Sequence, residues 1–573
     1  MSKDAITKNS ALKSVFLFIV ILYSNQLAGQ CDTLRYQKAV FENVIAHNDV
    51  KYGEAQVWSI PYNNTDLFMD IYEPEGDTLS KRPLMLWVHP GGFLTGDKTA
   101  DDMVALCDSF ARRGYVTASI GYRLGFNPTS QASGERAVYR GTQDMRAAIR
   151  FLKEYREEYR IDTNYTFLGG SSAGGFAALH TAYLEQHEAP NSITGGIASP
   201  DLGCLDCSGN EYQHGINLSG IVNLWGAIGD STWVNDYETV PALLIHGTED
   251  GVVPYGVGHP FGVFTTPLTH GSRCVSNQLD SHGIPHRLIA FEGEDHEPHG
   301  TSNGTFNDPP TPYWDTIFEA IDEHYFSIIQ PKDLTIQGPD EVCKKDTIQY
   351  TVNTPTGGNI CVHATNGSVI EVNENSFSIV WNESGEGFFD LYIQSSILAS
   401  SNKLSKSVLV RELPEVAIIA QGGAGTYSFQ PSPTGFTNYL WNFGDGNVAT
   451  SMGPTHTYND GGEFTVSLRV TDEFGCRNTT DTTINVSLLS IHNPEQMNID
   501  LYPNPSSDQF FIESTFPIEG IRVYDVLGKA VYQEQKQSNS YVISTKYWTQ
   551  GTYFVEIHKE GASPIRKKIV IAH

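Results

Sequence analysis

Basic residues are scarce in this sequence of 573 residues. Lys and Arg total 37 against 66 Asp and Glu, and the formal net charge is −29 at pH 7. Binding to nucleic acid depends on long-range attraction between basic side chains and phosphates. A chain with this excess of negative charge lacks that attraction, so we expect no nucleic-acid partner.

Long apolar runs are also missing. The run near the N-terminus, from Val15 to Tyr23, is about half of the roughly twenty residues that a membrane-spanning helix needs. Lysines precede this run, and small and polar residues follow it, which is typical of a secretory signal peptide. We therefore predict a signal peptide over residues 1–29 and no transmembrane segment after it.

Cysteine is infrequent, with eight residues in the whole chain. Cysteines of an exported protein can form disulfides. Cys204 and Cys207 are predicted to form a local disulfide, because no second pair with metal-ligand spacing favours a zinc site. Cys343 and Cys361 are candidates for a disulfide within one β domain, although their spacing leaves the connectivity open.

Turn-forming residues, in contrast, are plentiful, with 53 Gly and 28 Pro beside 40% hydrophobic residues. This composition supports packed cores joined by many turns, and it excludes wholesale disorder and a long coiled coil. At roughly 150 residues per domain, the length predicts three to four folding units.

The first of these units alternates strand-like and helix-like segments between residues 66 and 328. We expect strands at 83–88, 115–122, 165–168, 221–225, 242–246 and 288–291, and helices at 101–113, 135–159, from 173 onward and at 314–326. Such alternation predicts an α/β fold, with a mostly parallel sheet covered by helices on both faces. We assign residues 30–330 to this domain.

Beyond residue 331 the pattern changes to β-strand alternation with many turn residues and no long helix. This spacing is typical of successive all-β sandwich modules. We place their boundaries at 331–413, 414–488 and 489–573.

Ser172 lies in the strongest catalytic motif of the α/β region. Residues 170–174 read Gly-Ser-Ser-Ala-Gly and match G-x-S-x-G with Ser172 at the centre, between a predicted strand and a predicted helix. The glycines permit a sharp turn that exposes the serine oxygen, and the helix N-terminus behind it favours negative charge. We predict that Ser172 is a nucleophile.

The segment His-Pro-Gly-Gly-Phe, with Gly91 and Gly92 at its centre, directly follows the predicted strand at 83–88. Residues without side chains let backbone N–H groups approach a carbonyl oxygen that becomes negatively charged during acyl transfer. We predict that Gly91 or Gly92 supplies one donor of an oxyanion hole and that the N–H of Ala173 supplies the other.

The acid and the base are expected after two later strands. Asp250 lies in HGTEDGVVP, with Glu249 as the neighbouring alternative, and His296 lies in EGEDHEPH, with His299 as the alternative. The order Ser, Asp, His along the chain is expected when one parallel sheet presents all three at its carboxyl edge.

The motifs HPGGF, GSSAG, HGTEDGVVP and EGEDH resemble those of α/β-hydrolases of the carboxylesterase and lipase group, over residues 45–328. The resemblance implies that Ser172 attacks an ester carbonyl, that His296 acts as general base and that Asp250 orients the imidazole. Water then hydrolyses the acyl-enzyme, and no metal or organic cofactor is needed.

One residue departs from the pattern of this group. Pro90 stands in the second place of the commoner H-G-G-G motif and has no backbone N–H to donate. The choice between Gly91 and Gly92 as oxyanion donor therefore stays open.

The all-β region contains two further resemblances. Residues 439–446 (YLWNFGDG), 456–458 and 462–472 resemble a PKD domain, an Ig-like sandwich, and residues 331–413 resemble a related sandwich. Residues 501–506 (LYPNPS), 523–529 (VYDVLGK) and 550–555 (QGTYFV) resemble a type IX secretion sorting domain. That resemblance implies a secreted or cell-surface protein that engages the type IX secretion machinery.

These observations predict a secreted serine carboxylic-ester hydrolase that acts on a small-molecule or polymer-borne ester. A serine peptidase of the prolyl-oligopeptidase kind is one alternative, although the stretch before His89 is too short for the N-terminal propeller of that group. An inert carbohydrate-binding or adhesive surface protein is the other, although such a protein needs no complete set of nucleophile, acid, base and oxyanion glycines. We expect the Cys204–Cys207 loop and residues 255–274 to help form the substrate pocket.

Overall fold

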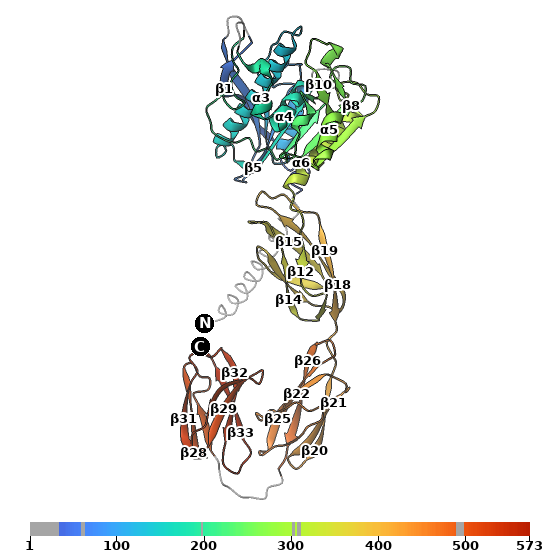
Figure 1. The fold of residues 1–573 in the computed structure, drawn as a ribbon. Helices are drawn as coiled ribbons and strands as arrows, with labels where there is room; N and C mark the ends of the chain where they lie inside the picture. The colour runs from blue at the N-terminus through green and yellow to red at the C-terminus, as the bar shows by residue number, and fades with distance from the viewer. Residues whose placement is uncertain (1–33, 59–62, 196–198, 301–303, 306–310, 489–497) are drawn as a thin grey trace, which may run out of the picture.

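The computed structural model describes residues 34–58, 63–195, 199–300, 304–305, 311–488 and 498–573. The predicted signal peptide lies outside these residues. An α/β domain stands at the top of Figure 1, and three all-β modules follow it along the chain. Among the described residues, no helix has both the length and the apolar character needed to cross a membrane.

An eight-stranded sheet forms the centre of the α/β domain, with the strand order β1-β2-β4-β3-β5-β6-β8-β11. Its parallel strands are β3 (Arg82–Val88), β4 (Val116–Ile120), β5 (Ile161–Ser171), β6 (Gly220–Leu224), β8 (Ala242–Gly247) and β11 (His286–Phe291). The antiparallel strands β1 (Val44–Gln56) and β2 (Asn64–Pro74) complete one edge. The predicted fold class, a mostly parallel sheet in an α/β domain, is confirmed.

Helices cover both faces of this sheet. They are α2 (Asp101–Ala111), α3 (Gln131–Glu154), α4 (Ala173–Tyr183), α5 (Ser272–Ser281) and α6 (Pro312–Ile329). Successive residues of β3 point to opposite faces: Leu86 packs in a core cluster with residues of α3, α4 and α5, whereas Trp87 packs in a second cluster with residues of α2 and α6. The central strands are buried on both sides, which explains their nearly continuous apolar sequences.

Helix α3 differs from its predicted range of 135–159. It begins at Gln131, because the side chain of Ser130 accepts a hydrogen bond from the backbone N–H of Ser133 and caps the helix. It ends at Glu154. The structure also contains a small antiparallel sheet that the sequence pattern did not indicate, formed by β7 (Ala227–Ile228), β9 (Val257–Gly258) and β10 (Thr269–Gly271).

Each all-β module consists of two packed sheets. The first module contains β12 (Ile336–Gln337), β13 (Glu341–Cys343), β14 (Thr347–Val352), β15 (Asn359–Thr365), β16 (Gly367–Val372), β17 (Ser376–Trp381), β18 (Gly385–Gln394) and β19 (Leu404–Arg411). The second contains β20 (Ala417–Gly423), β21 (Thr426–Ser432), β22 (Asn438–Asn442), β23 (Val448–Ala449), β24 (Thr455–Thr457), β25 (Gly462–Thr471) and β26 (Arg477–Val486). The third contains β27 (Ile499–Tyr502), β28 (Gln509–Ile518), β29 (Gly520–Asp525), β30 (Ala530–Glu534), β31 (Ser538–Ser544), β32 (Gly551–His558) and β33 (Ile565–Ile571).

Two disulfides are present among the described cysteines. Cys204 pairs with Cys207, as predicted. Cys343 pairs with Cys476 and joins the first β module to the second, so the predicted pairing of Cys343 with Cys361 is wrong. The reason is topological: β13 and β15, which carry Cys343 and Cys361, are the opposite edges of one four-stranded sheet. Three strand spacings, roughly 14 Å, exceed the reach of a disulfide.

A loop of the first β module is buried in the core of the α/β domain. Ile397 and Ala399, between β18 and β19, are 1% and 0% exposed and belong to the same cluster as residues of α2 and α6. The hydroxyl of Tyr36 donates a hydrogen bond to the carbonyl of Ile397 at 2.8 Å. The two domains therefore share one hydrophobic core at their junction.

Candidate active site

Ser172 occupies a sharp turn between β5 and α4. Its φ of 54° and ψ of −113° are rare for a residue with a side chain, and the neighbouring backbone explains how the turn is held. A Cβ atom on Gly174 would lie 2.0 Å from the carbonyl oxygen of Val88, and one on Gly170 would lie 2.3 Å from the carbonyl carbon of Gly174. Only glycines fit at these two positions, which explains the G-x-S-x-G spacing.

Three predicted site residues meet at the carboxyl edge of the sheet. Nε2 of His296 lies 2.9 Å from Oγ of Ser172, and Nδ1 of the same ring lies 2.7 Å from Oδ2 of Asp250. Asp250 follows β8 and His296 follows β11. The serine hydroxyl can thus donate to the imidazole, and the imidazole N–H to the carboxylate.

The two alternative residues lie elsewhere. Glu249 is exposed. The ring of His299 stacks on Trp225 at a centroid distance of 4.8 Å, and its Nε2 lies 3.4 Å from Oδ2 of Asp102. The structure brings His296, and not His299, to Ser172.

The carboxylate of Asp250 is surrounded by hydrogen-bond donors. Oδ1 accepts from the backbone N–H groups of Val252 and Val253 at 2.8 and 2.7 Å. Oδ2 faces His296 and also Nε2 of His246, at 3.2 Å. Burial by itself raises the pKa of Asp250, but the hydrogen bonds from His246 and His296 outweigh it and hold the pKa well below its usual range. The carboxylate is therefore ionised.

His246 contacts the predicted acid, and the sequence analysis did not single it out. It is the penultimate residue of β8 and is 0% exposed. The sequence carries two signals for it: it is the first residue of the HGTEDGVVP motif, and it ends an apolar strand four residues before the predicted acid.

The glycine pair after β3 forms a tight turn with positive φ at both residues, 116° for Gly91 and 61° for Gly92. A Cβ atom on Gly91 would lie 2.0 Å from the carbonyl oxygen of Thr95, so this turn requires glycine. Gly92 and Ala173 line a pocket together with Ser172, whereas Gly91 is not among the residues that line it.

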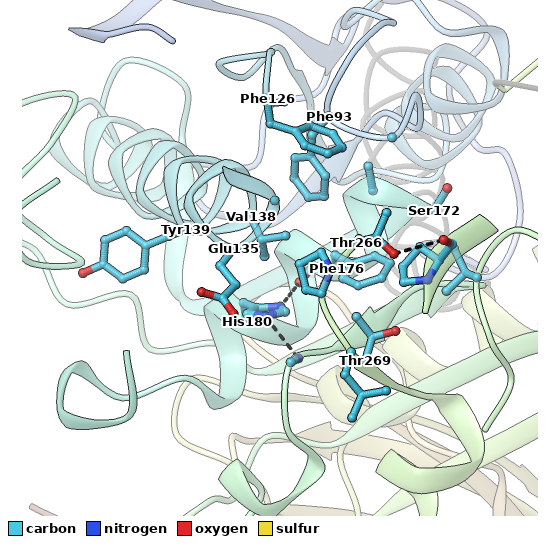
Figure 2. A pocket seen from close by; sticks show the side chains of 18 of the residues that line it. Phe93, Phe126, Glu135, Val138, Tyr139, Ser172, Phe176, His180, Thr266 and Thr269 are labelled. Atoms are coloured by element: carbon cyan, nitrogen blue, oxygen red, sulfur yellow. Dashed lines mark hydrogen bonds between the residues drawn. The ribbon is translucent and has the colours of Figure 1, made fainter. Parts of the chain in front are cut away.

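This pocket opens beside Ser172 and has a predominantly apolar wall. Figure 2 shows Ser172 toward one side, with Phe93 and Phe126 on one wall, and Glu135 and Tyr139 at the far side. Burial lowers the pKa of His180, another wall residue, to about 4, so its ring is neutral at pH 7. Glu135 is the only carboxylate among the described residues that line the pocket.

The segment between β9 and α5 covers part of the pocket, as predicted for residues 255–274. It contributes Phe261 and residues 266–269 to the wall. The loop with Cys204 and Cys207 does not line the pocket. It supports the wall indirectly, because the carbonyl of Gly203 accepts a hydrogen bond from the hydroxyl of Tyr139 at 2.9 Å.

Three family models match separate parts of the chain. The BD-FAE model matches residues 69–236, the PKD domain model matches residues 417–486, and the model of a secretion system C-terminal sorting domain matches residues 500–572. The chain contains an α/β-hydrolase domain, a PKD domain and a C-terminal sorting domain. The sorting domain indicates that the protein is secreted or exposed on the cell surface.

Relatives of the hydrolase domain include two mammalian carboxylesterases. Carboxylesterase 3B of Mus musculus is 34% identical over 241 residues, which cover 35% of this chain and 40% of the relative. Carboxylesterase 3 of Homo sapiens is 28% identical over 194 residues, which cover 34% of this chain and 29% of the relative. The chain thus spans less than half the length of the curated relatives it matches.

Solved structures similar to the hydrolase domain include Thermogutta terrifontis esterase 2 phosphorylated by paraoxon. That structure aligns with a TM-score of 0.35 and 19% identity, and the alignment covers 49% of this chain and 94% of the other. A truncated carbohydrate esterase from gut microbiota aligns with a TM-score of 0.32 and 17% identity, over 50% of this chain and 96% of the other.

Proposed function

We propose that this protein is a secreted or cell-surface serine hydrolase of carboxylic esters. The observation that carries the proposal is the hydrogen-bonded series Ser172, His296 and Asp250 at the edge of an apolar pocket. The match to carboxylesterases over the hydrolase domain supports the same reaction.

The proposed reaction begins when Ser172 attacks the ester carbonyl and transfers its proton to Nε2 of His296. Asp250 holds the imidazole in the required tautomer and stabilises the imidazolium that forms. His296 then protonates the leaving alcohol, and water attacks the acyl-enzyme by the reverse sequence of proton transfers. No cofactor takes part in this sequence.

The oxyanion of each tetrahedral intermediate is proposed to bind to backbone N–H groups. Ala173 begins α4, so its N–H lies at the positive end of a helix, directly after the nucleophile. Between the two glycines we favour Gly92 over Gly91 as the second donor, because Gly92 lines the same pocket as Ser172. Each such donor contributes about 3 kcal/mol to transition-state stabilisation.

The sorting domain defines the proposed route of export. We infer that the type IX secretion machinery recognises this domain, which matches the corresponding model over residues 500–572. The ester substrate is then met outside the cell, either as a small molecule or on a polymer.

The activity is tested with short- and medium-chain nitrophenyl esters and purified protein. We expect turnover by the wild type and a loss of at least about 10⁴-fold in kcat for Ser172→Ala and His296→Gln. His299→Gln is the matched control and should retain most of the activity, because His299 lies away from Ser172. Equal, negligible turnover by the wild type and Ser172→Ala would contradict the proposal.

A further inference from the structure

A second histidine lies behind the acid of the proposed triad. His246 is 0% exposed, and its Nε2 lies 3.2 Å from Oδ2 of Asp250 and 3.0 Å from the carbonyl oxygen of Val253. Both neighbours are acceptors, so this nitrogen carries a proton and points it between them. Asp250 thereby faces one histidine on each side.

The other nitrogen of His246 continues into a buried hydrogen-bonded chain. Nδ1 lies 2.8 Å from Oγ of Ser272, and this oxygen accepts from Nδ2 of Asn223 at 3.0 Å. Oδ1 of Asn223 accepts from the backbone N–H of Gly226 at 3.0 Å, which fixes the orientation of the amide. Ser272 therefore donates to Nδ1, and the proton of the ring sits on Nε2.

We propose that His246 is a positioning residue, which acts through Asp250 to hold the triad in its reactive geometry. The proposal rests on the esterase function above. The series runs from Asn223 through Ser272, His246 and Asp250 to His296, and it connects α5 and the centre of the sheet to the reacting serine.

Two contacts of His246 act on the same carboxylate. Its Nε2–H approaches Oδ2 of Asp250 directly. The same N–H also lies near the carbonyl oxygen of Val253, and the backbone N–H of Val253 donates to Oδ1 of Asp250. Loss of His246 therefore removes one donor and loosens the loop that supplies another. The carboxylate can then rotate away from His296, which weakens the orientation of the imidazole.

The burial of the series explains why a single missing partner matters. Asn223, His246 and Ser272 are each 0% exposed, and the side chain of Asp250 is 0% exposed. In such surroundings each hydrogen bond is stronger than in water, and water cannot replace a missing donor.

The test is a double-mutant cycle between His246 and Asp250. We would measure kcat and KM of the wild type, His246→Leu, Asp250→Ala and the double variant on a nitrophenyl ester, with active sites counted from the burst of nitrophenol. We expect His246→Leu to lower kcat by about 10- to 100-fold, as for the loss of one hydrogen bond to a charged group, with KM nearly unchanged. In the Asp250→Ala background, the same substitution should lower kcat no further.

Two milder variants keep the test informative if His246→Leu folds poorly. Ser272→Ala leaves the ring in place and removes its orienting partner, so it should lower kcat by a smaller factor, again only when Asp250 is present. His246→Gln keeps an N–H donor and should recover part of the lost kcat. His324→Leu is the matched control, because this histidine lies in α6 near Gly220, at the start of β6 and away from the site.

The proposal would be overturned if His246→Leu lowered kcat by the same factor in the Asp250→Ala background as in the wild type. An unchanged kcat per active site in His246→Leu would also overturn it. An inactive wild type would contradict the esterase function itself, so the two failures are distinguishable.

Discussion

Glu135 brings a negative charge into a pocket whose other described wall residues are apolar or neutral at pH 7. It projects from α3, and no basic side chain is among the described residues of the same wall. An acyl group that ends in a carboxylate would therefore meet repulsion with no compensating partner. We expect the pocket to select uncharged acyl groups.

This selectivity can be measured with a pair of nitrophenyl esters of equal length, one neutral and one ending in a carboxylate. Two like charges about 8 Å apart repel by about 2 kcal/mol at an effective dielectric constant of 20. Glu135→Gln should therefore raise kcat/KM for the anionic ester by roughly 10- to 30-fold and change the neutral ester little. Glu154→Gln, at the end of the same helix outside the pocket, should change neither. If the ratio of kcat/KM for the anionic ester to kcat/KM for the neutral ester is the same in Glu135→Gln as in the wild type, the proposed effect of this charge is refuted.

Most residues of the candidate site could be predicted from short sequence motifs. Ser172, Asp250 and His296 each stand in a short segment whose glycines and strand ends can be read from the sequence, because the turn geometry demands specific residue types. His246 stands in the same segment as Asp250, but its proposed role could not be read from that segment, since the role depends on a 3.2 Å contact with Asp250 and on a partner, Ser272, in a different element.

At the scale of elements, the loop between β18 and β19 is part of the hydrolase core. Ile397 packs beside residues of α2 and α6 although it belongs to the first β module. The alternation of strands and helices predicted the sheet and its covering helices well, because burial on both faces leaves a local pattern. A shared core between two domains leaves no such pattern, so the sequence showed only a change of composition near residue 331.

The shared core predicts that a substitution in the β module destabilises the hydrolase domain. Ile397→Asp places an unpaired charge in this core and should lower its stability by at least about 3 kcal/mol. The readout is the temperature at which esterase activity is lost irreversibly, which should fall by several degrees. Ile370→Asp is the control in the same module, because Ile370 is 58% exposed. Equal inactivation temperatures for the two variants would contradict a shared core.

At the scale of the whole molecule, the Cys343–Cys476 disulfide joins the first β module to the PKD domain across 133 residues of sequence. Figure 1 shows the PKD domain continuing away from the hydrolase domain below the first β module. The link restrains the joint between these two modules, and both of its cysteines lie outside the α/β domain that holds the candidate active site.

We expect the double substitution Cys343→Ser and Cys476→Ser to lower the stability of these two modules and to leave the esterase activity unchanged. In the chain-entropy model, a loop of this length contributes up to about 5 kcal/mol to stability. Unfolding of the modules by urea should shift to lower concentration, and kcat on nitrophenyl esters should stay at the wild-type value. Cys204→Ser with Cys207→Ser, which opens a much smaller loop, should leave the unfolding of the modules unchanged. If the urea unfolding transition of the Cys343→Ser, Cys476→Ser variant is not shifted, packing alone holds the two modules together.

The burial of Ile397 and Ala399 in the hydrolase core has a consequence for evolution and engineering. A recombination event that copies only the segment through α6 would leave an apolar gap in the α/β domain and an apolar loop exposed on the remainder. The hydrolase domain and the first β module should therefore be inherited, exchanged and expressed as one piece, whereas the PKD domain and the sorting domain can be replaced more freely behind them.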